Sequence, residues 1–375
     1  MSADAIRTAV PLTLRGDAYA RGRAQAAQCP DMIEHVRHAI VHRLSETAAA
    51  LRRPDVRAFI DVQRAITAAS YPEIVEEIRG IADGFGVDPA TLFDYLHCSS
   101  ATDLAELDEH GPDGCTSIAI TAQGGGALVA KNRDYRPEHI PIQRLMRHED
   151  PAWGGRALLV LGSLGSPGNF SSGMNSDGLA VADTASRTTD MGPGLHRYFL
   201  LTWLLVHCRS VDEAVAAIRR TTHTGSGLLL VGDAGGAVAA VELGHRRIGF
   251  EFKSSGRVAR TNHFVTPAMV PTNLEVAGSA ASGDNSRRRF RSLTALVEAM
   301  PATPDVHDVR GLLTYHGDEG GEALCRHGGD HLSATISGAI WDTARRQVSM
   351  ASGNPCQSPW LHAALGPGDE PAASA

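Results

Sequence analysis

The stretch from Asp113 to Asp134, which reads DGCTSIAITAQGGGALVAKNRD, decides the fold class of this chain. Two apolar segments, Thr116–Ala122 and Ala127–Lys131, have the composition of β-strands. The residues between them, Gln123-Gly-Gly-Gly126, are typical of a hairpin loop. The stretch therefore predicts an antiparallel hairpin with a cysteine at the start of its first strand.

The length of the hairpin loop sets which residue faces Cys115. If the loop is the four residues Gln123–Gly126, Cys115 lies opposite Asp134 on the second strand. A one-residue error in the length of this loop would instead pair Cys115 with Arg133. Either register predicts a thiol beside a charged side chain.

Helices are predicted on the N-terminal side of this hairpin. Apolar residues recur at helical spacing in Asp17–Gln28, Asp31–Arg52 and Pro72–Gly84, and Asp88 is placed to cap a further helix over Pro89–Leu96. The first hundred residues are therefore expected to be helical.

Strands and helices follow the hairpin in runs, without repeated alternation. Further strands are predicted at 157–161, 179–182, 228–231, 238–243, 257–261, 336–341 and 347–350, and helices at 198–208, 211–220 and 286–299. This order indicates an α+β layered architecture with antiparallel sheets.

Composition excludes several classes of protein. The chain has 375 residues, 43% of them hydrophobic and 21% charged, with a formal net charge of −7, which disfavours nucleic-acid binding. The one dense basic run, Arg287-Arg288-Arg289, is interpreted as a solvated helix face. No apolar run is long enough to span a membrane, and no secretory signal is visible. Six dispersed cysteines without a CxxC pair fit a cytoplasmic location.

The Gly114–Cys115 junction has a specific chemical use. Glycine tolerates strained conformations, so the Cys115 thiol can reach the carbonyl carbon before it. Hydrolysis of the resulting thioester frees the α-amine of Cys115, whose ordinary pKa is about 7.7–8.0. That amine can serve as the base for its own thiol. A buried structural cysteine is the alternative interpretation of Gly-Cys alone.

An ordered set of motifs resembles one family over about Asp17 to Trp360. After Asp113-Gly-Cys-Thr-Ser117 and Asn132-Arg-Asp134, the set continues with Gly173-Met-Asn-Ser-Asp-Gly-Leu-Ala-Val181, Gly225-Ser-Gly-Leu-Leu-Leu-Val-Gly232, Arg260-Thr-Asn-His263, Leu324-Cys-Arg-His327 and Ala334-Thr-Ile336. It resembles the acyl-coenzyme A:6-aminopenicillanic-acid acyltransferases, autoproteolytic N-terminal-nucleophile hydrolases related to choloylglycine hydrolases and penicillin V acylases.

This resemblance implies a four-layer αββα fold and a precursor that cuts itself between Gly114 and Cys115. Residues 1–114 would form a helical propeptide or α-chain, and residues 115–375 the catalytic β-chain, which stays associated with it. Cys115 would form an acyl-enzyme from a small-molecule amide or thioester. No cofactor, nucleic acid or membrane partner is implied, and a homo-oligomer is compatible with the sequence.

Individual roles follow from matching positions. The resemblance implies that Asp134 orients the new α-amine and that Asn262 is an oxyanion donor. Substrate contacts are assigned, more weakly, to Lys131, Arg133, Asn175, Ser226 and Arg326. Lys131 stands where the bile-salt and penicillin V enzymes have an arginine, and Asn175 also fits a tight turn.

One departure from the family pattern affects the substrate. Leu332-Ser333 precede Ala334, where the penicillin-forming enzyme has an arginine. Hydrolysis of another N-acyl amide is therefore expected, and a pocket rich in Gly, Leu and Ala would suit an apolar acyl chain.

Three alternatives remain open. A metal hydrolase is suggested by a crowded segment but disfavoured because no regular ligand spacing organises it; its members are His316, Asp318, Cys325, His327, Asp330 and His331. No metal site is therefore expected. The second alternative is a non-catalytic binding module of the same fold. The third is an unprocessed cysteine hydrolase with a histidine base, although His223 and His263 are expected to be structural groups or pocket walls.

Overall fold

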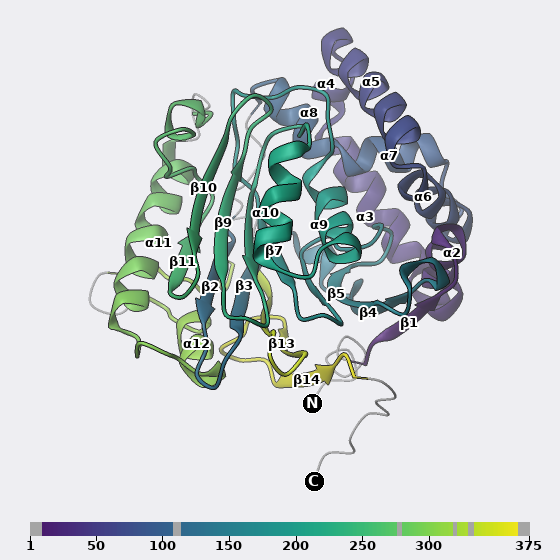
Figure 1. The fold of residues 1–375 in the computed structure, drawn as a ribbon. Helices are drawn as coiled ribbons and strands as arrows, with labels where there is room; N and C mark the ends of the chain where they lie inside the picture. The colour runs from purple at the N-terminus through teal and green to yellow at the C-terminus, as the bar shows by residue number, and fades with distance from the viewer. Residues whose placement is uncertain (1–9, 108–113, 276–279, 318–320, 329–333, 367–375) are drawn as a thin grey trace.

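The computed structural model describes residues 10–107, 114–275, 280–317, 321–328 and 334–366 (Figure 1). The α-helices of this part of the chain are α2 (Ala18–Gln28), α3 (Ile33–Glu46), α4 (Ala48–Leu51), α5 (Pro54–Ser70), α6 (Pro72–Phe85), α7 (Pro89–Leu96), α8 (Cys98–Leu104), α9 (Arg197–His207), α10 (Val211–Arg220), α11 (Ala280–Ala299) and α12 (Val306–Leu313). None of these helices is long and apolar enough to cross a membrane.

The strands form two sheets. The first sheet has the order β1 (Leu12–Arg15), β4 (Gln143–Glu149), β5 (Ala157–Ser163), β6 (Ser172–Asn175), β7 (Ala180–Thr184), β8 (Leu228–Gly232), β9 (Val238–Leu243) and β10 (Ile248–Lys253). The second has the order β11 (Arg257–Arg260), β2 (Thr116–Thr121), β3 (Ala127–Tyr135), β12 (Ala334–Asp342), β13 (Gln347–Ser352) and β14 (Trp360–Ala364).

Alternating residues of single strands point into different hydrophobic cores. In β5, Leu158 packs in the core beneath the N-terminal helices, α9 and α10, whereas Leu159 packs between the two sheets. In β2, Ala119 faces the core between the sheets and Ile118 faces α11 and α12. Three cores therefore separate four layers, and the expected α+β, αββα arrangement is confirmed (Figure 1).

The N-terminal region is not wholly helical, which corrects the expectation from the sequence. The helices α2, α6 and α7 begin and end close to the predicted positions, and Asp88 caps α7 by accepting a 2.8 Å hydrogen bond from the Thr91 amide. The predicted segment Asp31–Arg52 is divided into α3 and α4, and α5 and α8 were not predicted individually. The element that is not helical is β1, which pairs in parallel with β4 and extends the first sheet. A four-residue strand whose partner lies more than a hundred residues away has no local hairpin signal.

The register of the β2–β3 hairpin is also corrected. Thr116 pairs with Asn132 and Thr121 with Ala127, one residue away from the register of a four-residue loop. The loop is shorter because the Ala122 amide donates to the Gly126 carbonyl at 2.9 Å. Gly126 adopts a φ of 70°, which glycine tolerates, and so closes the turn early. Continued one step beyond Thr116, this register sets Cys115 level with Arg133, the predicted alternative.

Candidate active site

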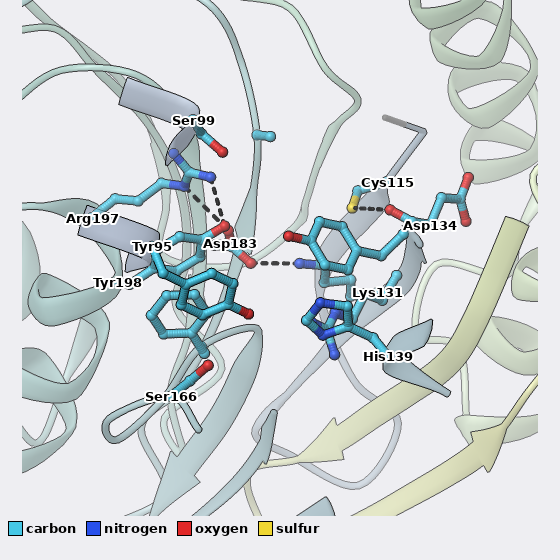
Figure 2. Close-up of a pocket in the computed structure, with 14 residues that line it drawn as sticks. Tyr95, Ser99, Cys115, Lys131, Asp134, His139, Ser166, Asp183, Arg197 and Tyr198 are labelled. Atoms are coloured by element: carbon cyan, nitrogen blue, oxygen red, sulfur yellow. Dashed lines mark hydrogen bonds and ion pairs between the residues drawn. The ribbon is translucent and has the colours of Figure 1, made fainter. Parts of the chain in front are cut away.

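Cys115 lies at the entry to β2, next to the end of β3. Its side chain is buried, and its Sγ donates to the Asp134 backbone carbonyl at 3.8 Å (Figure 2). The Asp134 carboxylate accepts a hydrogen bond of 2.6 Å from Thr335 Oγ1 on the neighbouring strand β12. The predicted proximity of Cys115 and Asp134 is therefore present, although the two residues are not directly paired.

Gly114 packs tightly against charged side chains. A Cβ atom added at Gly114 would lie 2.5 Å from Asp134 Oδ2. The guanidinium of Arg326 would be as close, and this group lies 3.8 Å from the same carboxylate oxygen. A side chain at Gly114 would therefore require the Asp134 carboxylate or the Arg326 guanidinium to shift. Arg326 is thus placed beside the Gly114–Cys115 peptide bond.

Asn262 is connected to Cys115 through an arginine. Its side-chain nitrogen donates to the Ala185 carbonyl at 2.9 Å, and its Oδ1 accepts from Arg289 at 2.9 Å. The same guanidinium donates at 2.8 Å to the backbone carbonyl of Cys115. Asn262 is therefore held at the site, with its amide engaged by backbone and Arg289.

Arg289 is a site residue that the sequence interpretation missed. Arg287 and Arg288 are exposed as expected, but Arg289 is fully buried. Successive helical residues point about 100° apart, so three in a row cannot share one solvated face. This periodicity is the signal that singles out one arginine. Burial lowers the pKa of Arg289 to about 10, which reflects how far its charge is removed from water.

A cavity opens beside Cys115 between the ends of the two sheets (Figure 2). Its walls carry aromatic rings and charged groups; the lining residues are Tyr95, Ser99, Cys115, Lys131, Arg133, Asp134, Tyr135, His139, Ser166, Phe170, Asp183, Ala185, Arg197 and Tyr198. This lining differs from the expected one of Gly, Leu and Ala. Tyr95 and Ser99 precede Gly114 in the chain, so both sides of the Gly114–Cys115 bond contribute walls.

A buried charge network forms one side of the cavity. Lys131 of β3 donates to Asp183 of β7 at 2.5 Å, and Arg197 of α9 approaches the other carboxylate oxygen at 3.3 Å (Figure 2). All three side chains are at most 4% exposed. The ion pair joins the two sheets, because Lys131 and Asp183 project toward each other from facing strands.

Arg133 is a second buried cation of the cavity. Its guanidinium donates to Gln143 Oε1 at 3.3 Å and to Ser163 Oγ at 3.1 Å. Among the described residues, no carboxylate lies within ion-pair distance of it. Burial of an arginine beside neutral acceptors is unfavourable unless a ligand supplies the anion. Arg133 lines the cavity, and its contact with a substrate stays a prediction.

Two of the predicted substrate contacts have other partners. Asn175 donates to the carbonyls of Leu205 and Cys208, both at 2.8 Å, and accepts from the Leu179 amide. It therefore holds a turn against the end of α9, which was the alternative interpretation. Ser226, with a φ of 68°, donates to Asp103 at 2.9 Å. Neither residue is among those that line this cavity.

The histidines near the site differ in position. His223 bonds the Ile218 carbonyl at 2.8 Å and His263 bonds Ser286 Oγ at 2.8 Å, in agreement with the structural roles expected for them. His139, which was not singled out, lines the cavity and contacts Ser163 Oγ at 2.9 Å. Burial, and then the charges of Arg133, Arg136 and Arg43, lower the pKa of His139 well below its ordinary value.

The structure brings together potential metal ligands around Cys325 that the sequence spacing did not predict as a site. Potential ligand atoms of His316, Cys325, His327 and Cys356 all lie within 4.8 Å of one another. Cys356 is far along the chain and was not part of the predicted group. Asp318, Asp330 and His331 lie outside the described residues. This geometry counts against the expectation that no metal site is present.

Comparison with known protein families gives one match. The family model described as acyl-coenzyme A:6-aminopenicillanic acid acyl-transferase matches residues 121–357. This range includes β3, Asn262 and Arg326 and begins six residues after Cys115. A comparison with curated protein sequences gives no significant match.

The solved structures that match this chain have low sequence identity to it. A mutant of the conjugated bile acid hydrolase from Clostridium perfringens is 12% identical, with 67% of this chain and 97% of that chain covered and a TM-score of 0.42. Penicillin V acylase from Agrobacterium tumefaciens is 14% identical, with 64% and 83% covered and a TM-score of 0.42.

Proposed function

The chain belongs to the acyl-coenzyme A:6-aminopenicillanic acid acyltransferase family, and from this premise we propose that it is a self-cleaving cysteine N-acyl amide hydrolase or acyltransferase. Membership makes it an enzyme of the amide hydrolase and acyltransferase kind. The finer proposal is that Cys115 is the nucleophile of an N-terminal-nucleophile enzyme and that residues 1–114 and 115–375 are the two products of its maturation.

The packing of Gly114 is the observation that carries this proposal. The residue before the thiol lies against the Asp134 carboxylate and the Arg326 guanidinium, so close that a side chain there would displace one of them. Tight packing of the Gly114–Cys115 junction supports the proposal, because attack is favoured when the reacting groups need little reorientation. A cysteine that only opens a strand has no need of this arrangement.

Self-cleavage would proceed by a shift of the acyl group from nitrogen to sulfur. Cys115 Sγ attacks the carbonyl carbon of Gly114, the C–S bond forms, and the C–N bond breaks as the amide nitrogen takes up a proton. Water then hydrolyses the thioester, which releases the Gly114 carboxylate and restores the thiol. The new α-amine of Cys115 remains beside Asp134.

Turnover would use the same thiol. The α-amine takes the Sγ proton, Sγ attacks the acyl carbonyl of the substrate, and the leaving group departs as a protonated amine or thiol. Water or a second amine then receives the acyl group. Asp134 would orient the amine, and Asn262 is proposed as an oxyanion donor, fixed by its bond to Arg289.

The cavity favours a substrate with a ring and a negative charge. Phe170 and Tyr198 stack with their centroids 3.7 Å apart, and Tyr95 and Tyr135 complete an aromatic wall. Arg133 supplies a buried positive charge without an ion-pair partner among the described residues. We therefore propose that Arg133 binds an anionic group, such as a carboxylate, on an aryl-containing N-acyl amide.

The intact mass of the denatured protein tests maturation. The wild type is expected to give two chains that separate between Gly114 and Cys115, whereas Cys115→Ala gives one chain. Under native conditions the two wild-type chains should co-elute, because β1 pairs with β4 and the N-terminal helices share a core with the first sheet. An alanine variant that still cleaves would refute the proposed nucleophile.

Steady-state kinetics test the substrate proposal. Arg133→Gln should raise KM for an aryl acyl amide that carries a carboxylate by about tenfold, equivalent to about 1.4 kcal/mol, and leave KM for its neutral amide analogue nearly unchanged. If Arg133→Gln raises KM for both substrates by the same factor, Arg133 supports the structure of the cavity wall and does not bind the carboxylate.

An unprocessed cysteine hydrolase is the second candidate, and the position of His139 in the cavity is the observation that favours it. In that case the wild type stays in one piece, and His139→Gln loses turnover. If the chain is processed, His139→Gln should retain cleavage at Gly114, because the thiol then uses no histidine base.

A further inference from the structure

We propose that His316, Cys325, His327 and Cys356 bind one Zn²⁺ ion. Two of these residues are thiols and two are imidazoles, the ligand set of closed tetrahedral zinc sites in which the metal stabilises structure. Their ligand atoms all lie within 4.8 Å of one another, close enough to share one ion.

The distances agree with a tetrahedral ion. Zinc at its usual distances from sulfur and nitrogen separates two thiolates by about 3.8 Å, two nitrogens by about 3.3 Å and a mixed pair by about 3.6 Å. Here the Sγ atoms of Cys325 and Cys356 are 3.5 Å apart, and the Nε2 atoms of His316 and His327 are 2.9 Å apart. His327 Nε2 lies 3.9 Å from Cys325 Sγ and 3.1 Å from Cys356 Sγ.

Charge balance favours zinc at this cluster. Two thiolates and two neutral imidazoles carry a charge of −2, which one Zn²⁺ neutralises, and binding releases the two thiol protons.

The backbone holds the ligands in place independently of a metal. The Tyr315 carbonyl, next to His316, accepts hydrogen bonds from the amides of Leu324 and Cys325, both at 3.0 Å. Asn354, in the loop that carries Cys356, donates to the Arg326 carbonyl at 2.6 Å. Three separate segments therefore converge at one point, and a pre-organised set of ligands binds a metal with little loss of conformational entropy.

The proposed site also bears on the chemistry at Gly114. Arg326 lies between the ligands Cys325 and His327 in the sequence, and its guanidinium approaches Asp134 and Gly114. Zinc would fix the segment and thereby position Arg326. This consequence, unlike metal binding itself, rests on the proposed self-cleavage.

Metal analysis of the full-length protein tests the proposal. The protein is produced with added zinc, kept reduced and passed over a chelating resin. It should then retain about one Zn²⁺ per chain, as measured by elemental mass spectrometry. Cys356→Ser and His316→Ala should lose most of it. His307→Ala, which changes an exposed histidine of α12, and Cys115→Ala, which removes a thiol outside the cluster, should keep it.

Two measurements on the wild type avoid dependence on variants that fold poorly. Substitution of Co²⁺ should give the intense visible bands of a tetrahedral thiolate site. Bound zinc should also protect Cys325 and Cys356 from alkylation until a chelator is added. A metal-free wild type, a Cys325–Cys356 disulfide in freshly purified protein, or full zinc content in Cys356→Ser would each overturn the proposal.

Separate readouts distinguish this proposal from the proposed function. Zinc content is measured on Cys115→Ala, which does not depend on processing. If zinc binds and wild-type cleavage is also observed, Cys356→Ser should cleave several-fold more slowly than His307→Ala. Zinc binding without any cleavage would leave the metal site intact and refute only the self-processing mechanism.

Discussion

Arg289 of α11 donates a hydrogen bond of 2.8 Å to the backbone carbonyl of Cys115. The same guanidinium bonds Asn262, so one buried cation joins a helix to the two residues proposed as nucleophile and oxyanion donor. Because Arg289 is fully buried, its positive charge acts on Cys115 with little screening by water. The arrangement connects the outer helical layer to the chemistry.

Replacement of Arg289 should therefore affect processing more than a typical buried substitution. Arg289→Met removes the hydrogen bonds to Cys115 and Asn262, together with those to Asn285 and Thr116. A hydrogen bond from a charged donor is worth about 1.5–3 kcal/mol, so cleavage at Gly114 should slow at least about tenfold. Arg288→Met, on an exposed neighbour, is the matched control. Cleavage is followed by denaturing gel or intact mass; equal rates in the two variants would contradict the role of Arg289.

Gly114→Ala should impair cleavage although it leaves the thiol in place. The added Cβ would overlap Asp134 Oδ2 and Arg326, and the displacement that follows should slow the reaction about 10- to 100-fold. Gly311→Ala on α12 is the control, since no heavy atom lies within 4 Å of its new Cβ, and alanine stabilises a helix by up to about 1 kcal/mol. The test fails if Gly114→Ala matures at the wild-type rate.

The Lys131–Asp183–Arg197 network predicts an asymmetry between its members. Asp183→Asn leaves two buried cations without their common counter-charge and should destabilise the fold by about 3–5 kcal/mol. Lys131→Met should destabilise the fold less, because the Asp183 carboxylate still pairs with the Arg197 guanidinium. Urea unfolding in the Cys115→Ala background, where the chain stays in one piece, compares the two. A larger loss for Lys131→Met would show that Arg197 does not compensate.

Buried histidines predict a loss of stability in acid. Burial lowers the pKa of His97 to about 4, whereas the unfolded chain titrates near its ordinary value of about 6.5. The unfolded state therefore binds more protons between these values, and stability is full above about pH 6.5 and falls toward about pH 4. At about pH 5 the loss from His97 is about 2 kcal/mol.

Urea unfolding of the Cys115→Ala protein at about pH 7.5 and about pH 5 measures this loss. His97→Phe should flatten the pH dependence by the same amount, since Phe cannot bind the proton and His97 already stacks on Phe93. His307→Ala, on an exposed position, should leave the dependence unchanged. An unchanged slope in His97→Phe would show that other groups dominate.

The hairpin around Cys115, the α+β class and the helices of the first hundred residues could be predicted because their signals are local. Turn glycines, apolar spacing and the Asp88 cap act within a few residues of one another. The register of that hairpin needed the structure, because the difference between pairing Cys115 with Asp134 or with Arg133 depends on a single hydrogen bond across the turn, from Ala122 to Gly126.

The sequence by itself determined the family and the candidate reactive groups: a Gly114–Cys115 junction, a nearby Asp134 and the ordered family motifs that contain Asn262 and Arg326. The tertiary structure alone decided which distant residues complete them. Arg289 reaches Cys115 from 174 positions away, and Cys356 joins His327 from 29 positions away. Chain spacing does not reveal which distant residue each of these partners contacts, because layer packing and not chain distance brings them together.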